Sequence, residues 1–275
     1  MSPLLESAAR AALLGAAPLL LMQGRSVRRR ALRLPEAPGE RSGGSFDSEG
    51  GVRLLILGDS SAAGVGVPDQ SVALSGQLLR RLDELGEAPA RWRLVARTGV
   101  RAADLIGMLD ESGLTESAAA AREASTDGSY SAPQARFDLA VIAIGVNDVT
   151  GATPLSRWVA SLDALHSRLQ ALGVRQTVFS GLPPMGRFPA LPQPLRSYLG
   201  LQARRYDRAL AQWAGTRPGI SHLPLASADD PGLLAADGFH PGEAGCALWA
   251  GQLVSRFRQP RHVASGDLLS GQRAF

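Results

Sequence analysis

The chain has 275 residues, of which 45% are hydrophobic and 20% charged, a composition typical of one globular domain with a well-buried core rather than a disordered protein. All 29 basic residues are arginine, and they exceed the 25 acidic residues only slightly. Outside one dense run at residues 25–33, the arginines alternate with Asp and Glu. Proteins that bind nucleic acid gather positive charge on one face, so we expect no nucleic-acid partner.

The cysteine and histidine content argues against a disulfide or a metal site. Cys246 is the only cysteine, and its neighbours are small or apolar. We therefore expect it to lie on a helix and to be buried in the core. The four histidines lie far apart, without the i,i+4 pairing of a helical zinc site. We therefore predict no metal and no other cofactor. The sequence does not indicate the oligomeric state.

The N-terminal region combines an apolar run with positive charge. Residues 11–22 are apolar, contain Pro18, and precede the arginine run at 25–33. A membrane-spanning helix needs about 20 apolar residues, and an export signal carries its positive charges before the apolar stretch rather than after it. We expect residues 1–30 to be a membrane-associated segment, with membrane contact through residues 11–30 and a cytoplasmic domain behind it. The alternatives are export through an atypical N-terminal signal and a loose soluble tail.

The remaining chain divides into a linker, a domain and a tail. Residues 31–51 are rich in Pro, Gly, Ser and charge, which predicts a linker. The domain is expected at 52–258, and 259–275 form a tail without a strong pattern. Residues 110–133 are predicted to be a partly helical insertion, and the Pro-rich stretch 182–194 to form neither regular element.

Within the domain, strand-like and helix-like segments alternate. We predict strands at 53–57, 92–96, 139–144, 177–180 and 220–223, and helices at 72–85, 155–172, 198–213 and 243–257. Such β–α alternation predicts an α/β fold, a three-layer α/β/α sandwich with a central parallel sheet.

Polar motifs follow several of these strands, where the carboxyl ends of parallel strands meet. They are Gly58-Asp59-Ser60, Thr98-Gly99, Gly145-Val146-Asn147-Asp148 and, before the last helix, Asp237-Gly238-Phe239-His240-Pro241.

These residue types can form a nucleophilic site. A serine hydroxyl such as that of Ser60 needs a base, and the His240 imidazole can take and return its proton. Asp237 can fold back on a tight turn at Gly238 and fix the imidazole tautomer. The backbone N–H groups of Ser60 and Gly99 and the side-chain amide of Asn147 can stabilise the oxyanion of a tetrahedral intermediate.

Each motif alone has a simpler explanation. Gly-Asp-Ser is a common turn, and Asp148 can serve only to cap a helix. The occurrence of all the motifs in this order at predicted strand ends favours a catalytic site.

Neighbouring residues receive structural roles in this interpretation. Ser61 is interpreted as structural, and Asp59 as ordering the loop. We assign Asp229 and Asp230 to a turn, and His166 and His222 to ordinary helix and strand positions. The Pro-rich stretch either shapes an acyl pocket through Met185, Phe188 and Leu191 or forms a rigid cover.

The four motifs resemble those of the GDSL/SGNH hydrolase superfamily, over about residues 53–256. The resemblance implies a flavodoxin-like sandwich, with Ser60 as nucleophile, Asp237 and His240 completing the catalytic triad, and Gly99 and Asn147 in the oxyanion hole. The second family motif often has an Asn a few residues before its Gly, whereas Ala96-Arg97-Thr98 stand here. The G-x-S-x-G pattern of the α/β-hydrolases is also missing around Ser60.

The expected function is therefore that of a serine hydrolase acting on a small-molecule ester through an acyl-enzyme. A lipid or other small acyl ester is the substrate we expect. One alternative is an O-deacetylase of a carbohydrate or cell-wall polymer. A second is a catalytically idle binding or scaffold protein on the same fold.

Overall fold

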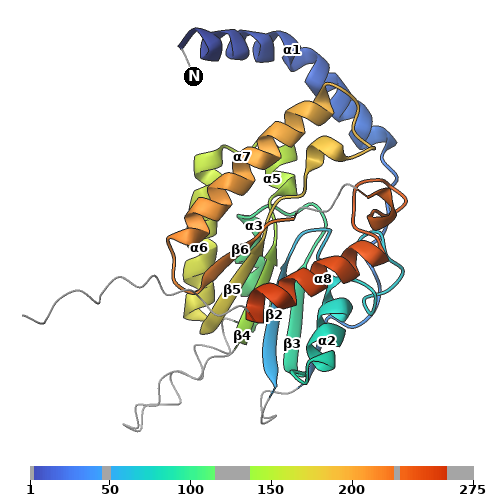
Figure 1. Cartoon of the computed structure of the whole chain (residues 1–275), viewed down its shortest axis with the longest axis vertical. Helices are drawn as coiled ribbons and strands as arrows, with labels where there is room; N and C mark the ends of the chain where they lie inside the picture. Colours follow the sequence, from blue (N-terminus) through green and yellow to red (C-terminus); the bar gives the residue numbers. More distant parts are fainter. Residues whose placement is uncertain (1–2, 45–50, 115–136, 226–229, 259–275) are drawn as a thin grey trace, which may run out of the picture.

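A computed structural model describes residues 3–44, 51–114, 137–225 and 230–258 of the chain (Figure 1). Its strands form a six-stranded sheet in the order β1-β3-β2-β4-β5-β6. The strands are β1 (Ser42–Gly44), β2 (Val52–Gly58), β3 (Pro89–Ala96), β4 (Phe137–Ala143), β5 (Val174–Ser180) and β6 (Ile220–Leu223). The helices are α1 (Pro3–Arg30), α2 (Leu74–Glu84), α3 (Asp104–Glu111), α5 (Val146–Thr150), α6 (Leu155–Ala171), α7 (Leu195–Gly215) and α8 (Glu243–Arg258), with short 3₁₀ helices η1 (Met185–Arg187) and η2 (Pro231–Leu233).

The sheet is parallel from β3 to β6, and only β1 at the edge is antiparallel to its neighbour. Counting the parallel strands alone in chain order, they are arranged 2-1-3-4-5, the flavodoxin-like order. In this arrangement the connections diverge between β2 and β4, and ligands bind in the crevice that opens there. The predicted fold class is confirmed.

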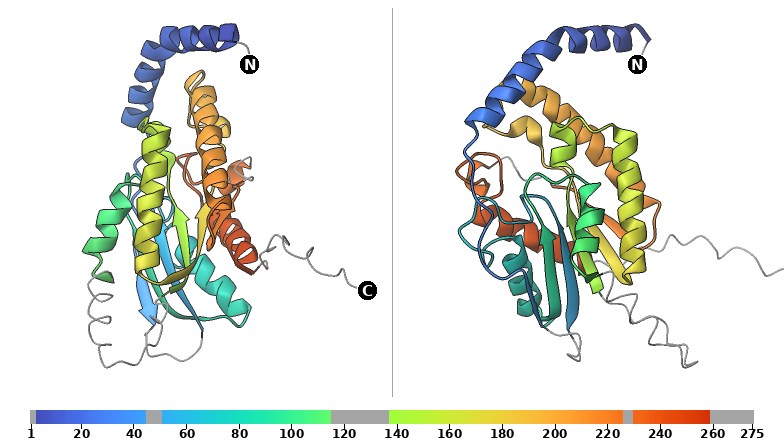
Figure 2. Two further views of the ribbon diagram at one scale, coloured as in Figure 1. Left: turned by 90° about the vertical axis from the view of Figure 1, so that its left-hand side faces the viewer. Right: turned by 180° about the vertical axis from the view of Figure 1, so that it is seen from behind.

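Helices cover both faces of the sheet, which explains why its central strands are apolar throughout (Figure 2). Along β2, Leu55 and Leu57 pack in the core cluster that contains residues of α3, α6 and α7, whereas Leu54 and Ile56 pack in the cluster that contains residues of α2 and α8. All four side chains are fully buried. Alternate residues of one strand therefore hold the two outer layers against the middle one.

Each strand and helix expected within the domain is present, with ends that differ by a few residues. Four further elements of the domain, α3, α5, η1 and η2, were not predicted from the sequence. The short helix η1 lies within the Pro-rich stretch 182–194, where no regular element was expected. The predicted insertion at 110–133 begins inside α3, and its part from residue 115 onward lies outside the described residues, as do the predicted tail at 259–275 and Asp229.

Part of the segment predicted as a linker packs on the sheet. Ser42–Gly44 form β1 and pair with β3. The Leu94 N–H donates to the Arg41 carbonyl at 2.7 Å, and the Arg41 guanidinium donates to the Ala96 carbonyl at 2.9 Å. Ala37 is 3% exposed. This segment therefore contributes a strand and buried contacts, which its Pro- and Gly-rich composition concealed.

The N-terminal helix α1 lies at the end of the molecule toward which the parallel strands run (Figure 1). The Gln23 side chain donates to the Gln193 carbonyl at 2.7 Å and accepts from the Leu195 N–H at 3.1 Å. Within the described residues, no helix has the length and apolar content required to cross a membrane.

Candidate active site

The predicted site residues come from loops that follow different strands of the sheet. Ser60 lies two residues after the end of β2, and Asn147 lies in the first turn of α5, directly after β4. These two strands are neighbours in the sheet, at the point where the connections diverge. The loop that carries Asp237 and His240 comes from the far end of the domain, just before α8. The fold thus brings the loop of Ser60 into contact with the loop of Asp237 and His240.

A continuous chain of hydrogen bonds links three of the predicted residues. His240 Nε2 lies 2.9 Å from Ser60 Oγ, and His240 Nδ1 lies 2.6 Å from Asp237 Oδ2. Ser60 is 8% exposed, and the side chains of His240 and Asp237 are 16% and 6% exposed. A base beside the hydroxyl and a carboxylate behind the base is the arrangement that activates a serine.

A tight turn aims the Asp237 carboxylate at the imidazole. Gly238 has φ +65°, in the left-handed region that favours glycine. Asp237 Oδ1 accepts the backbone N–H groups of Phe239 and His240, each at 3.0 Å, which leaves Oδ2 for the imidazole. Burial acts to raise the pKa of Asp237, but the hydrogen bonds from the His240 ring and from these backbone groups outweigh it, so the pKa is lowered. Asp237 therefore stays ionised beside the histidine at neutral pH.

The loop that carries Gly99 is held on both sides of the glycine. Before it, the Thr98 N–H donates to Glu36 Oε1 at 2.6 Å. After it, the Asn147 amide donates to the Val100 carbonyl at 2.9 Å, and Asp148 Oδ2 accepts the Ala102 N–H at 3.0 Å. Gly99 itself has φ +82°. Asn147 and Asp148 thus tie α5 to the Gly99 loop, and Asp148 does more than cap a helix.

The three predicted oxyanion donors follow three different strands: Ser60 follows β2, Gly99 follows β3 and Asn147 follows β4. Among the described residues, no hydrogen bond uses the backbone N–H of Ser60 or that of Gly99. Asn147 Nδ2 carries two hydrogens, and the bond to Val100 occupies one of them. Each of the three groups consequently has a hydrogen available for a ligand.

Asp59 organises the turn after β2, as predicted from its place before Ser60. Its Oδ1 accepts the Ser61 N–H at 3.0 Å. Burial raises the pKa of Asp59 to about 6, and the Ser61 hydrogen bond offsets this only in part. Burial likewise raises the pKa of Asp148 in spite of its hydrogen bond from Ala102. The loops of the site thus contain two carboxyl groups that burial makes harder to ionise.

Other residues singled out in the sequence are placed as follows. Cys246 is buried at 1% exposure, as predicted. Asp230 caps η2 by accepting the Gly232 N–H at 2.8 Å. His222 is not an ordinary strand position, because its Nε2 lies 2.8 Å from Asp207 Oδ1, an oxygen that also accepts the Leu182 N–H. Glu36 and Asp207 were not predicted to have a role, since each acts on a loop far away in sequence.

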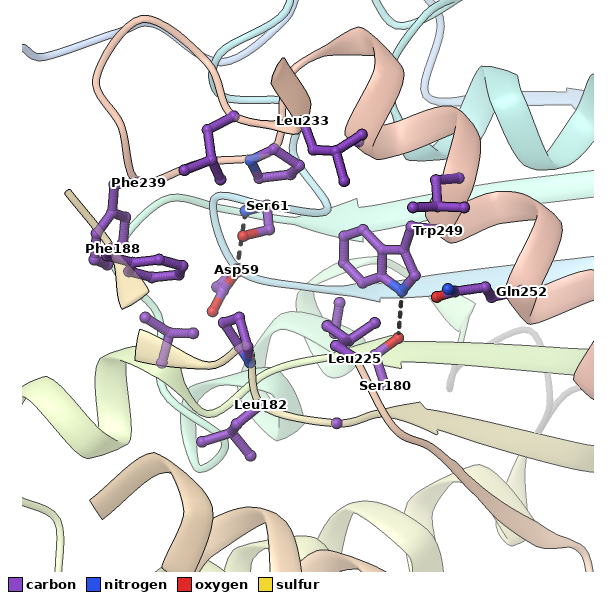
Figure 3. Close-up of a pocket in the computed structure, with 18 of the residues that line it drawn as sticks. Asp59, Ser61, Ser180, Leu182, Phe188, Leu225, Leu233, Phe239, Trp249 and Gln252 are labelled. Atoms are coloured by element: carbon purple, nitrogen blue, oxygen red, sulfur yellow. Dashed lines mark hydrogen bonds between the residues drawn. The ribbon is translucent and has the colours of Figure 1, made fainter. Parts of the chain in front are cut away.

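An apolar pocket lies beside the nucleophile loop, between the ends of β4 and β5 and helix α8 (Figure 3). The Trp249 indole stands within it and donates to Ser180 Oγ at 2.9 Å. Asp59 and Ser61 line the side next to Ser60, and the remaining lining is mostly Leu, Phe and Pro. Of the three residues proposed to shape an acyl pocket, only Phe188 lines it, whereas Met185 and Leu191 are buried in the core. All three side chains belong to the core cluster that contains residues of α7, and Phe188 also reaches the pocket.

No group of three or more metal-ligand side chains is assembled in the part of the chain that the structure describes. Residues 56–248 match the sequence model of the GDSL-like Lipase/Acylhydrolase family, a span that includes Ser60, Asn147, Asp237 and His240. The chain belongs to this family. A comparison with curated proteins gave no match.

Solved structures with the same fold include a lipase and an acetylxylan esterase. The lipase Lip_vut3 from a goat rumen metagenome is 15% identical, with a TM-score of 0.58 over 74% of this chain and 96% of its own. TesA is 22% identical, with a TM-score of 0.53 over 75% of this chain and 98% of its own. The acetylxylan esterase Axe2 from Geobacillus stearothermophilus is 18% identical, with a TM-score of 0.53 over 77% of this chain and 96% of its own. At these identities the similarity establishes the fold, an α/β/α sandwich.

Proposed function

We propose that this family member hydrolyses carboxylic esters with an apolar acyl chain, through an acyl-enzyme on Ser60. The observation that carries the proposal is the hydrogen-bonded chain from Ser60 Oγ through the His240 imidazole to the Asp237 carboxylate, with distances of 2.9 and 2.6 Å.

The reaction follows from this geometry. His240 Nε2 takes the hydroxyl proton as Ser60 Oγ attacks the ester carbonyl, and the resulting imidazolium is stabilised by Asp237. The N–H groups of Ser60 and Gly99 and the free hydrogen of Asn147 bind the oxyanion. The imidazolium then protonates the leaving alcohol, which departs and leaves the acyl group on Ser60. Water then attacks the acyl carbonyl as His240 takes its proton. The bond from the carbonyl carbon to Ser60 Oγ breaks, the imidazolium returns the proton to Ser60 Oγ, and the acid departs.

The apolar pocket supports a fatty acyl substrate over an acetylated carbohydrate. It is lined largely by side chains such as Leu182, Leu225, Phe239 and Trp249, which present little hydrogen-bonding capacity to a sugar. Burial of each methylene contributes about 0.8 kcal/mol, or roughly fourfold in binding. An acetyl group would leave most of this surface uncovered. We therefore expect activity to rise with acyl length until the pocket is full.

The test is hydrolysis of p-nitrophenyl esters from acetyl to palmitoyl by the wild type, Ser60→Ala and Ser61→Ala. We expect Ser60→Ala to lose at least about 10³-fold in kcat. Ser61→Ala should retain turnover because the His240 imidazole is hydrogen-bonded to Ser60 Oγ. A fluorophosphonate should label the wild type on Ser60 and leave Ser60→Ala unlabelled.

Two results would contradict the proposal. Equal activity of Ser60→Ala and wild type would remove Ser60 as nucleophile. A wild type that neither reacts with the fluorophosphonate nor turns over any ester, acetylated sugars included, would favour the idle scaffold. A strict preference for acetyl esters would favour the O-deacetylase.

A further inference from the structure

The charge of the chain is unevenly distributed. Residues 7–35 contain six arginines and no acidic residue, whereas the rest of the chain contains 23 arginines and 25 acidic residues. The positive charge is therefore concentrated in α1 and the residues that follow it, and the remainder is close to neutral. Such asymmetry is typical of a protein that meets an anionic surface on one side.

The same segment exposes large apolar side chains. The described residues include seven such exposed side chains, and four of them lie between positions 19 and 32: Leu19 at 41%, Leu21 at 62%, Met22 at 60% and Leu32 at 55% exposure. Apolar side chains scattered singly on a surface need no explanation, but a cluster marks an interaction site.

Contacts with the domain determine which side of α1 faces outward. Leu20 and Val27 pack against the core, and Gln23 between them forms the two hydrogen bonds to the loop before α7. Arg28 donates to the Thr150 carbonyl at 3.1 Å. Positions 20, 23 and 27 share one face of a helix. Met22, Arg25 and Arg29 share the opposite face by the same spacing, and all three are exposed.

This outward face lies at the catalytic end of the molecule. Thr150 belongs to α5, which carries Asn147, and Leu195 begins α7 directly after the loop that contains Phe188 of the apolar pocket. Figures 1 and 2 show α1 lying across the end toward which the parallel strands run. A surface in contact with α1 would consequently lie close to the site.

We propose that α1 is an interfacial helix that docks the catalytic end of this protein onto an anionic lipid bilayer. Leu19, Leu21 and Met22 enter the boundary between head groups and acyl chains, and Arg25, Arg29, Arg30 and Arg33 pair with anionic head groups. A bilayer satisfies both sets of side chains. A second copy of the chain would bring the same arginines together, and a nucleic acid would leave the apolar side chains in water.

The experiment is co-sedimentation of the full chain with vesicles of phosphatidylcholine alone or mixed with phosphatidylglycerol, at low and high salt. All proteins carry Ser60→Ala so that the vesicles are not hydrolysed, which makes the result independent of the proposed activity. One variant replaces Arg25, Arg29, Arg30 and Arg33 with Gln, and a second replaces Leu21 and Met22 with Gln. A matched control replaces four exposed arginines on α2, α6 and α7 with Gln: Arg80, Arg157, Arg205 and Arg208. Gln23 and Arg28 stay unchanged because they hold α1 on the domain.

We expect binding to mixed vesicles that weakens with salt, and weak binding to phosphatidylcholine alone. The arginine variant should lose about 10²-fold or more in partition coefficient, while the control, with the same change in net charge, should bind like the parent. The Leu21 and Met22 variant should lose about tenfold.

Three outcomes would overturn the proposal. They are equal pelleting of the arginine variant and its control, no effect of the Leu21 and Met22 substitutions, and a lipid-free dimer in light scattering that these two substitutions convert to monomer. The last would assign the surface to a second copy of the chain. Circular dichroism of each variant checks that α1 is retained.

Discussion

Glu36 and Thr98 are 62 positions apart in sequence, and the carboxylate of the first accepts the backbone N–H of the second at 2.6 Å. Arg41 holds Glu36 in place through a salt bridge of 2.7 Å and also binds the Ala96 carbonyl. Partial burial acts to raise the pKa of Glu36, but the hydrogen bond from Thr98 and the charge of Arg41 lower it overall. An ionised Glu36 therefore constrains Thr98, the residue next to Gly99. In this chain Ala96-Arg97-Thr98 stand before Gly99, in the part of the loop where the family often has an Asn.

We predict that Glu36→Ala lowers kcat by about tenfold with little change in KM, because a displaced Gly99 N–H weakens binding of the oxyanion more than binding of the ground state. Glu36→Gln, which keeps an oxygen acceptor, should retain more activity than Glu36→Ala. Steady-state kinetics check this, with exposed Glu40→Gln as the control from the same segment. An unchanged kcat in Glu36→Ala would show that the Gly99 loop does not depend on this contact.

Asp237→Asn should lower kcat by about 10⁴-fold while KM changes little. The amide can still contact the imidazole, but it no longer favours the tautomer that accepts the serine proton, nor stabilises the imidazolium. Burst kinetics with a p-nitrophenyl ester measure the acylation step directly. A loss of less than tenfold would mean that the 2.6 Å contact with His240 serves structure alone.

The raised pKa of Asp59 predicts that the free energy of unfolding depends on pH. Its pKa is raised from 3.8 to about 6, so the native state binds the proton more tightly than the unfolded state does. The free energy of unfolding contributed by this group is highest below pH 4 and falls as pH rises to about 6. The shift corresponds to a change of about 3 kcal/mol in the free energy of unfolding. Asp59→Asn should remove this loss, so that the variant gains stability over wild type between pH 4 and 7. Urea unfolding across this range measures the difference, and parallel curves for the two proteins would contradict it.

Under the proposed function, Leu225→Trp should restrict hydrolysis to esters with shorter acyl chains. Leu225 lines the apolar pocket next to Trp249, so a larger side chain there would fill space that long chains need (Figure 3). We expect kcat/KM for octanoyl and longer esters to fall by about 10- to 100-fold relative to acetyl. Leu201→Trp, at an exposed position on α7, is the control. A uniform effect on all chain lengths would place the acyl group elsewhere.

Cys246 should resist alkylation in the native protein. It is 1% exposed, and burial raises the pKa of its thiol to about 12, so little thiolate forms at neutral pH. Iodoacetamide should label it only after unfolding, as mass spectrometry would detect. Rapid labelling of the folded protein, with loss of the proposed esterase activity, would indicate that α8 opens readily.

The sequence predicts the parts of the fold that depend on periodicity. β2, β4 and α6 have strong apolar patterns, and their positions agree with the predictions. The segment containing Ala37 and Ser42 could not be assigned in this way, because its contacts with β3 and with the Gly99 loop are made by backbone groups and single side chains. No periodicity reports such contacts.

The residues of the candidate site were also predicted only in part. Short motifs were enough to nominate Ser60, Asp237 and His240, because each motif contains the reactive group itself. The His222–Asp207 pair was not predicted, since it depends on α7 lying beside β6. The Pro-rich stretch was predicted only in part, because composition does not distinguish Phe188, which lines the pocket, from Met185 in the core.

The contact between Ser60 and His240 spans 180 positions of the chain. A ribosome adds about 5–20 residues per second, so the proposed nucleophile is synthesised roughly 10–40 s before its base. The nascent chain during this interval has a serine without a partner to activate it. A product terminated early, anywhere before His240, would likewise be unable to attack an ester. Under the proposed mechanism, hydrolysis therefore begins only once the chain is long enough to bring the loop of His240 against the loop of Ser60. Incomplete copies of the chain do not hydrolyse the esters around them.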